Sequence, residues 1–389
     1  MPWKQTNAME ERIRYVVRAE RASGSLNELS AEFGIHRTTG WRWRQRLQQV
    51  GRIEELAERS RRPLRSPRQT GAALQQRIVE LRRQYGWGAL KLGVLLQREG
   101  LAVATSTIHR VLLRHGLIGP EETHRPAVRR FERSAPNELW QMDFKGLRQR
   151  MAAAQGAVYP LSIEDDHSRY LLVLQRVANT SAELVREHLQ GAFRDCGVPD
   201  GMLMDHGTPW WSAQSPQGFT KLSLWLMKQG IALHWGRIRH PQTQGKVERF
   251  HGELQRALQY RPPRADLQSW LDEFRWEHNH VRPHEALGMQ TPVSHWRRSE
   301  RSYDPNPPAW EYPASSWVLK VDSDGKIKLK GEHWLISRAL SGERIQLVTM
   351  EHRILVYYCR SLVRELDLGN QRSTIVDRWL PNESSQTKL

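Results

Sequence analysis

The spacing of the apolar residues changes twice along this chain, and each spacing predicts a different kind of fold. Up to about residue 135, apolar side chains recur at helical intervals. Between Pro136 and His295, strand-like and helical runs alternate, and beyond Pro313 the period becomes two. We therefore predict a multidomain protein: N-terminal all-α helix-turn-helix units, a central α/β core with a mixed sheet, and a small C-terminal antiparallel β-barrel. A length of 389 residues fits two to three domains.

Proline, glycine and arginine clusters mark the expected boundaries between these regions. The predicted divisions are a helix-turn-helix domain at 1–58, an Arg/Pro-rich linker at 59–70, a second helical unit at 71–120, the α/β core at 136–296, a Pro-rich linker at 304–313, the barrel at 314–368, and a poorly ordered tail at 369–389.

Positive charge is concentrated in the first third of the chain. The formal net charge is +17, and the first 135 residues hold 26 Lys and Arg against 13 Asp and Glu. Segregated cationic charge favours a polyanionic partner, because phosphate contacts release counterions. We therefore expect double-stranded DNA as a partner, against the alternative of a solubilising surface.

Other compartments and partners are disfavoured by the composition. The longest uncharged run with much apolar content is 151–163, too short to span a bilayer, so no membrane partner is expected. No apolar stretch follows Lys4, so a secretory signal is not expected. Two cysteines form no disulfide framework. These features predict a cytoplasmic protein.

The first helical region has the pattern of a helix-turn-helix. Ser25-Leu-Asn-Glu28 predicts a capped short helix, Gly34 a turn, and 36–48 a second helix. Small residues at Ser30 and Gly40 would let the helices cross closely. A generic helical hairpin has the same spacing, but the arginine content favours DNA binding. The residues expected to contact DNA are Arg37, Thr38, Thr39, Arg42 and Arg44.

Two further N-terminal segments have open interpretations. The unit at 71–120 is either a second DNA-reading module or a helical spacer. Arg61 and Arg62 lie in an extended Arg/Pro-rich arm, which suits phosphates or a minor groove but equally a flexible tether.

Three acids in the central region stand where strands or helices end. Asp143 lies on or at the end of a predicted strand, Asp205 directly follows the apolar strand at 201–204, and Glu248 lies near the start of a helix. Clustered carboxylates repel one another unless a cation lies among them, and Mg²⁺ prefers such oxygen ligands. Two such ions suit phosphodiester displacement. The alternative is that each acid is a cap or an ion-pair partner.

At this point the sequence resembles the integrase core of bacterial insertion-sequence transposases, and within them the IS-four-eighty-one-like group. The motifs that carry the resemblance are Leu139-Trp-Gln-Met-Asp143-Phe, Ile163-Glu-Asp-Asp-His-Ser-Arg169-Tyr, Met204-Asp205-His-Gly207, His240-Pro-Gln-Thr-Gln-Gly-Lys-Val-Glu248-Arg-Phe-His251, and His278-Asn-His-Val-Arg-Pro-His-Glu-Ala-Leu-Gly288 followed by Thr291-Pro292. The resemblance covers roughly residues 1–296.

The resemblance implies an RNase H-like core in which Asp143, Asp205 and Glu248 are the catalytic Asp-Asp-Glu triad. It implies two Mg²⁺ ions per site, for which Mn²⁺ substitutes, with Asp143 bridging both. The implied activity is a transposase that binds the inverted-repeat ends of a mobile element, hydrolyses a phosphodiester and transfers the strand. Cutting two ends together implies a homodimer or higher oligomer on DNA. The alternatives are a non-catalytic DNA-binding regulator derived from a transposase, and an RNase H-like nuclease without strand transfer.

This chain departs from the family pattern in two places. The 42 residues between Asp205 and Glu248 are more than many relatives have, and the surplus falls in the turn-rich segment 209–218. His206 stands where Asn is common in the family. Both departures concern loop geometry and leave the three acids in place.

Several neighbouring residues have two interpretations each. Lys246 and Arg249 are expected to hold DNA phosphates, the alternative being a solvated helix face. We assign Asp165 and Asp166 a structural role in a hairpin turn. For His206 we favour local support over a phosphate contact, for Arg282 and His284 pinning to the core over DNA binding, and for Trp210 and Trp211 a loop anchor over base stacking. His251 is open between packing and a DNA contact.

Overall fold

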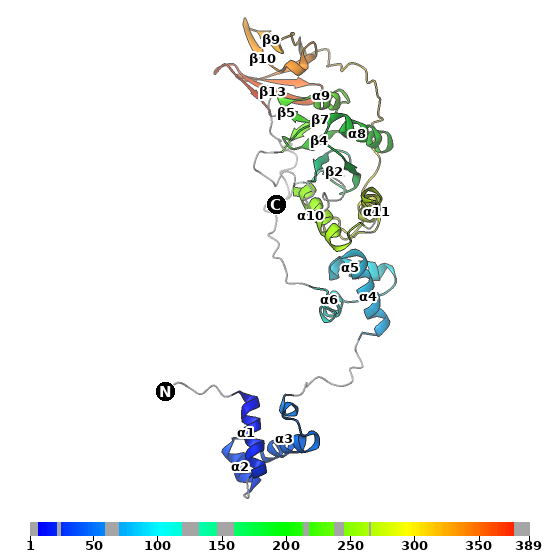
Figure 1. The fold of residues 1–389 in the computed structure, drawn as a ribbon. Helices are drawn as coiled ribbons and strands as arrows, with labels where there is room; N and C mark the ends of the chain where they lie inside the picture. The colour runs from blue at the N-terminus through cyan, green and yellow to red at the C-terminus, as the bar shows by residue number, and fades with distance from the viewer. Residues whose placement is uncertain are drawn as a thin grey trace. The chain divides into compact units, whose positions relative to one another are not determined.

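The computed structural model describes residues 7–21, 25–58, 70–118, 132–145, 159–212, 218–236, 245–263 and 266–376. The chain divides into two compact units, Met1–Gln69 and Thr70–Leu389. The first unit contains only helices, whereas the second combines helices and sheets (Figure 1). Within the described residues, no helix is long and apolar enough to cross a membrane.

The N-terminal unit is the predicted arrangement of short helices. Its elements are α1 (Ala8–Arg21), α2 (Leu26–Glu32), α3 (Arg37–Val50) and the 3-10 helix η1 (Ile53–Leu56). Ser25 caps α2 by accepting a hydrogen bond from the main-chain N–H of Asn27. Tyr15, Val16, Ala19, Leu29 and Leu56 form the buried core of the unit.

The small residues predicted to allow close helix crossing both lie against Tyr15 of α1. The Tyr15 hydroxyl is 2.9 Å from Ser30 Oγ. A Cβ added to Gly40 of α3 would stand 2.1 Å from Tyr15 Oη. Gly40 therefore allows α3 to approach α1 to a distance that no larger side chain permits.

We expect Gly40→Ala to destabilise this unit by about 2 kcal/mol, because the added methyl forces buried Tyr15 out of its position. Urea unfolding of the full chain, followed together with hydrogen exchange of α1, measures the loss. Gly191→Ala is the matched control, since it is also in a helix and its Cβ would meet nothing within 4 Å. Equal stability of the two variants would contradict the proposed close contact.

A second set of three helices opens the larger unit. They are α4 (Ala72–Tyr85), α5 (Ala89–Arg98) and α6 (Thr105–Arg114), and they lie in the region predicted to be a second helical unit. Their apolar faces form one buried cluster that includes Ile78, Leu92, Leu96, Ile108 and Leu112. The second helical unit is therefore a packed helical bundle with its own core.

The central sheet confirms the predicted mixed α/β core. Its strands are β1 (Trp140–Phe144), β2 (Tyr159–Asp165), β3 (Leu171–Val177), β4 (Gly201–Met204) and β7 (Ala232–Trp235), in the order β3-β2-β1-β4-β7. β2 pairs antiparallel with β1 and β3, whereas β4 pairs parallel with β1 and β7. The parallel pairing brings the carboxyl ends of β1 and β4 to the same edge of the sheet.

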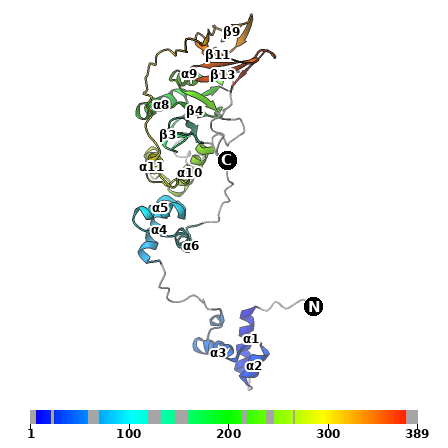
Figure 2. The same ribbon diagram turned by 180° about the vertical axis from the view of Figure 1, so that it is seen from behind.

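Helices cover this sheet on both faces. They are α8 (Ala182–Cys196), α9 (Lys221–Lys228), α10 (Gly245–Tyr260) and α11 (Leu267–His280). Phe193 of α8 packs with Trp140 of β1 in one buried cluster, and Phe250 of α10 packs with Leu171 of β3 in another. Figure 2 shows α10 and α11 side by side. A two-stranded ribbon, β5 (Trp211–Ser212) and β6 (Gly218–Phe219), flanks the core.

The C-terminal region is antiparallel, as predicted, but the predicted barrel is wrong for the described strands. These strands are β8 (Trp317–Lys320), β9 (Lys326–Leu329), β10 (Glu332–Leu335), β11 (Arg344–Met350), β12 (Arg353–Tyr358), β13 (Ser361–Asp367) and β14 (Arg372–Ile375). Five of them form an open sheet in the order β14-β13-β12-β11-β8. The other two, β9 and β10, pair with each other as a separate ribbon.

The open sheet joins the central domain through β13, which contacts β7. Val363 and Leu366 of β13 belong to the same buried cluster as Leu226 and Leu233 of the core. Ser361 Oγ accepts a hydrogen bond from the Leu233 N–H at 3.0 Å.

The boundaries expected at the C-terminal end differ in detail from the structure. β14 lies inside the tail predicted as poorly ordered from Gly369, so that prediction is wrong for Arg372–Ile375. In the Pro-rich segment 304–313, the Tyr312 hydroxyl donates to the Arg344 carbonyl at 3.0 Å and accepts from the Cys359 N–H at 2.9 Å. The described residues also include the 3-10 helices η3 (Glu285–Leu287), η4 (Pro292–Ser294) and η5 (Arg338–Leu340).

Candidate active site

Asp143 and Asp205 occupy equivalent places on neighbouring parallel strands. In the parallel pairing of β1 with β4, Trp140 lies beside Met202 and Gln141 beside Leu203. Continuing it by two residues places Asp143, on β1, beside Asp205, which directly follows β4. The two carboxylates predicted from separate strand ends therefore meet at one edge of the sheet.

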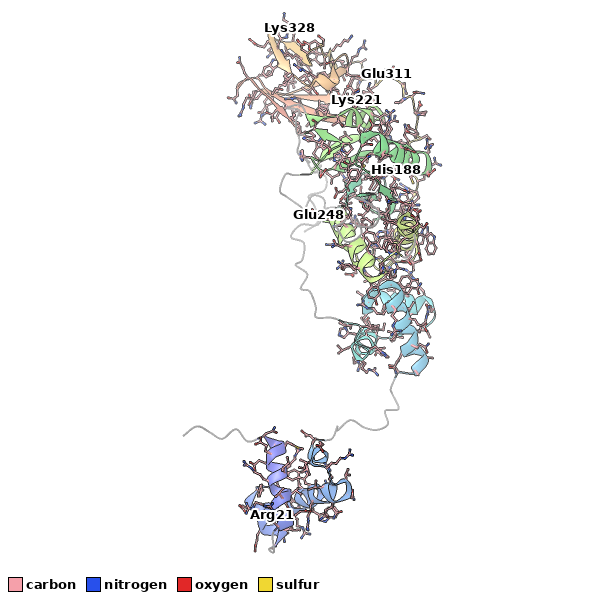
Figure 3. All side chains as sticks on the ribbon, in the orientation of Figure 1. Arg21, His188, Lys221, Glu248, Glu311 and Lys328 are labelled. Carbon is pink, nitrogen blue, oxygen red and sulfur yellow. The ribbon has the colours of Figure 1, made fainter. Side chains whose placement is uncertain are left out.

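Glu248 belongs to the first turn of α10, the helix that packs over β1 (Figure 3). Its side chain is exposed, and partial desolvation raises its pKa. Val247 and Phe250 on the same helix are buried against the sheet side. These two buried side chains hold the helix against the sheet, and Glu248 lies exposed near the start of the helix.

The pKa of Asp143 depends on its own burial and on the other two acids. The pKa of Asp143 is raised to about 7, first by burial and then by repulsion from Asp205 and Glu248, against the lowering effect of the main-chain hydrogen bond from Phe144. That N–H donates to Asp143 Oδ1 at 2.8 Å. Strongly shifted carboxyl pKa values of this kind cluster at functional sites, and a cation among the carboxylates would relieve their repulsion.

Asp205 is held in place by donors from its own loop. Its Oδ1 accepts from the Gly207 N–H and from Trp210 Nε1, both at 2.8 Å. Trp210 is only 1% exposed and stacks on Phe144 with a centroid distance of 5.1 Å. Trp210 is thus the anchor that we favoured over a base-stacking residue, and it also orients a predicted catalytic acid, a role that no sequence signal indicated.

His251 links the helix of Glu248 to the strand of Asp143. It is 5% exposed; its Nδ1 is 3.5 Å from Asp143 Oδ2 and its Nε2 is 2.8 Å from Ser162 Oγ. Burial lowers the pKa of His251 to about 3, so the ring is neutral. Of the two interpretations left open for His251, packing is therefore the one that the structure supports.

Asp165 and Asp166 have the structural role predicted for them. Asp165 accepts hydrogen bonds from the Asn137 N–H and from both the N–H and hydroxyl of Ser168. Asp166 accepts from Gln141 Nε2 at 2.6 Å and from the Arg133 N–H at 2.9 Å. Both carboxylates are buried, which removes them as rivals to the three acids at the sheet edge.

Lys246 does not have the position expected of a phosphate contact. Its Nζ lies 2.7 Å from Asp166 Oδ1 and donates to the Asp166 carbonyl at 2.9 Å, with the side chain 17% exposed. Arg249, three residues further along α10, is exposed. Of the two predicted contacts on this helix, Arg249 alone has the accessibility that the role requires.

The segment after α11 is pinned to the core, as we favoured for Arg282 and His284. Arg282 is 6% exposed and forms an ion pair with Glu253 of α10. The ring of His284 packs edge-on to His278, and His278 Nε2 lies 3.0 Å from the Arg169 carbonyl. His206 stacks edge-on with Trp211 at 4.8 Å, which is local support.

The predicted DNA contacts in the N-terminal unit lie on α3 or outside the described residues. Arg37, Thr38 and Arg42 are exposed, whereas Thr39 and Arg44 are half-buried. Arg61 and Arg62 fall in 59–69, outside the residues that the structure describes. Three of the seven predicted N-terminal contacts are therefore placed as a DNA-binding surface requires.

Comparisons with known proteins agree with this architecture. Residues 133–241 and 229–292 match families described as Integrase core domain, and residues 39–112 match a Homeodomain-like domain. The Transposase for transposon Tn552 of Staphylococcus aureus is 24% identical over 229 residues, in a match that covers 52% of this chain and 46% of that protein. The chain thus spans less than half the length of this relative.

Solved structures with related cores share little sequence with this chain. The HTLV-2 integrase catalytic core domain in complex with magnesium is 15% identical, with a TM-score of 0.34, covering 42% of this chain and 97% of that one. A chain of the simian T-cell lymphotropic virus intasome in complex with PP2A regulatory subunit B56 gamma is 17% identical, with a TM-score of 0.38, covering 72% and 95%. The fold described above rests on strand order and register rather than on these scores.

The family matches agree with the predicted resemblance at the level of an integrase core. The two Integrase core matches together cover the central sheet and its helices through α11, and the Homeodomain-like match runs from α3 into α6. Over residues 133–292, the central domain is similar to integrase core domains.

Proposed function

We propose that this protein is a DDE transposase that binds the ends of a mobile element and catalyses metal-dependent DNA cleavage and strand transfer. The observation that carries the proposal is the meeting of Asp143 and Asp205 on neighbouring parallel strands, with Glu248 close enough to raise the pKa of Asp143. The whole-chain activity is inferred from this site together with the transposase relative and the integrase core.

The donor set fits hard divalent cations. Three carboxylates and no sulfur ligand suit Mg²⁺ or Mn²⁺; the pKa of Asp143 is raised by burial and by repulsion from the other acids, and a cation would relieve that repulsion. Among the described residues, no three His, Cys, Asp or Glu side chains are grouped closely enough to hold a metal ion. We therefore infer that ion binding draws the exposed Glu248 side chain toward the two aspartates.

The chain's own residues then have separate tasks. Asp143, Asp205 and Glu248 would hold two divalent ions, which supply charge stabilisation for an in-line displacement at phosphorus and lower the pKa of the attacking water. Trp210 and Gly207 keep the Asp205 carboxylate oriented. His251 holds α10 against β1 and so fixes the start of the Glu248 helix. No side chain serves as a nucleophile, since water and a DNA 3′ hydroxyl fill that role.

We expect Mg²⁺ to stabilise the protein more at pH 8 than at pH 6. The pKa of Asp143 is raised from 3.8 to about 7. The stability that protonation of Asp143 gives the metal-free native state is therefore fully present below pH 3.8 and is lost as the pH rises through 7. Mg²⁺ has to displace this proton, so its apparent affinity falls by up to about tenfold for each pH unit below 7.

The Mg²⁺-induced shift in Tm at the two pH values measures this effect. Asp143→Asn should abolish the pH dependence of the shift, whereas Asp272→Asn, an exposed carboxylate on α11, should leave it unchanged. An identical Mg²⁺ shift at pH 6 and pH 8 in the wild type would contradict the assignment of Asp143.

The helical domains supply the proposed DNA binding. Arg37, Thr38 and Arg42 on α3 face solvent, and Arg249 is exposed next to Glu248. We propose that α4–α6 form a second DNA-reading module, and that the chain acts as a dimer or higher oligomer because two element ends have to be cut together. The C-terminal strands stay a proposed aid to DNA or subunit binding. Membership of the IS-four-eighty-one-like group stays a prediction from the motifs.

The test uses the DNA that flanks the gene as substrate, with Mg²⁺, and resolves products on a denaturing gel. A transposase gives 3′-end nicks and joined products. Nicking without joining supports the RNase H-like nuclease, and tight binding without cleavage in Mg²⁺ or Mn²⁺ supports the regulator. Either of the latter results overturns the transposase proposal.

A further inference from the structure

Two tryptophans of α3, separated by one residue, have opposite environments. Trp43 faces the interior, where it lies edge-on to Tyr15 at 6.0 Å and under the guanidinium of Arg12 at 5.4 Å. Trp41 is 57% exposed, among the most exposed large apolar side chains in the described residues. Packing of the N-terminal unit therefore accounts for Trp43 and leaves Trp41 without a structural task.

The surroundings of Trp41 distinguish it from an incidental exposed residue. Arg37 is one helical turn before it, Arg42 follows it directly, and both are exposed with Thr38 on the same side. The whole of α3 carries four arginines and no acid. A single exposed indole is ordinary on a protein surface, but here it lies in a field of positive charge that matches one kind of partner, a polyphosphate backbone.

We propose that Trp41 reads the element end by contacting the C5-methyl group of a thymine in the major groove, between phosphate contacts made by Arg37 and Arg42. This inference rests on the proposed function of the helical domain as a DNA-end reader. A thymine methyl is the one apolar group that base pairs present in the major groove, and an indole on a groove-facing helix is its natural apolar partner. The arginines position the helix, and Trp41 supplies sequence preference.

Helix geometry supports this assignment. Arg37 and Trp41 are four residues apart, and Thr38 and Arg42 are likewise four apart, so the four side chains form two adjacent rows near the start of α3. Residues near the start of a recognition helix are those that reach base edges. Gly40, between the rows and the core, holds α3 against Tyr15 and so fixes which face is turned outward.

The experiment measures binding of the full chain to three duplexes at fixed salt. They are the terminal sequence of the flanking DNA, the same duplex with single thymines replaced by deoxyuridine, which lacks only the methyl, and a scrambled duplex. In the wild type, one or two deoxyuridine positions should weaken binding about fivefold. Trp41→Ala should bind the terminal duplex about tenfold more weakly and should no longer respond to deoxyuridine at those positions.

A matched control separates contact from general damage. Trp276, on α11, is 58% exposed, so Trp276→Ala removes an equally exposed indole from another surface and should leave both affinity and the deoxyuridine response unchanged. Both variants should keep the wild-type Tm, because neither indole is buried.

Two results would overturn the Trp41 assignment while leaving end binding intact: wild-type affinity in Trp41→Ala, or an unchanged deoxyuridine response in that variant. A wild-type protein that binds terminal and scrambled duplexes equally would instead contradict the proposed end-reading function, and the Trp41 assignment with it. The deoxyuridine comparison therefore distinguishes failure of the residue from failure of the function.

Discussion

Glu248→Gln should lower metal-dependent cleavage and strand transfer on the order of 10³-fold while leaving DNA affinity within about twofold. The neutral amide keeps the size and hydrogen-bonding capacity of the side chain but is a poor ligand for a hard divalent ion. Loss of one ligand removes several kcal/mol of charge stabilisation in the transition state, and each ~1.4 kcal/mol corresponds to a factor of ten in rate. Single-turnover assays on flanking DNA with Mg²⁺ measure the loss.

Glu187→Gln is the matched control for this result. Glu187 is an exposed glutamate on α8, a helix that packs on the other core cluster, so its variant should keep wild-type rates. The account would be contradicted by a Glu248→Gln protein that still joins DNA at a rate near that of the wild type. Parallel loss of DNA binding would instead indicate that Glu248 supports the fold.

Lys246→Met should lower the free energy of unfolding by about 3 kcal/mol. The Asp166 side chain is fully buried, and the Lys246 ammonium 2.7 Å away is its charge partner. Removing one member of a buried ion pair leaves the other charge uncompensated, which costs more than the pair itself contributes. Urea unfolding of the variant and the wild type at pH 7 gives the difference, when the free energies of unfolding of both depend equally on urea concentration.

Arg249→Met tests the neighbouring position on the same helix. Arg249 is exposed, so its loss should leave unfolding unchanged and should weaken DNA binding with a reduced salt dependence. If Lys246→Met kept its stability and lost DNA affinity instead, the ion pair with Asp166 would not be the role of Lys246. The two variants thus separate a structural lysine from a phosphate-binding arginine three residues apart.

The sequence was sufficient to predict the elements and the meeting of two acids. Asp143 and Asp205 each follow or end an apolar strand-like run, and short-range periodicity identifies such runs. Once β1 and β4 pair in parallel, their carboxyl ends share an edge. The helix of Glu248 likewise followed from its apolar face, in which Val247, Phe250 and Leu254 are buried.

The sequence could not predict the contacts of Lys246 and His251, because their partners are distant along the chain. The sequence predicts that Lys246 is a surface cation on a helix. Only the fold brings it to Asp166, 80 residues earlier. His251 depends in the same way on Ser162, 89 residues away. Local patterns carry no information on such pairs.

The barrel prediction failed for a related reason. Alternating strands predict a sheet with one apolar face, but not what covers it. Here β13 contacts β7 of the core through Ser361 and Leu233, and the described strands form an open sheet. The inward turn of Trp43 and the outward turn of Trp41 were also beyond periodicity alone, because the α3 sequence alternates tryptophan and arginine.

The central claim is that Asp143, Asp205 and Glu248 together hold the catalytic divalent ions. The most direct test is anomalous diffraction from crystals of the protein grown with Mn²⁺ and element-end DNA. We predict anomalous peaks in contact with all three carboxylates, with Glu248 drawn toward the aspartates. Mn²⁺ peaks elsewhere in the chain, with these three carboxylates bare, would contradict the account.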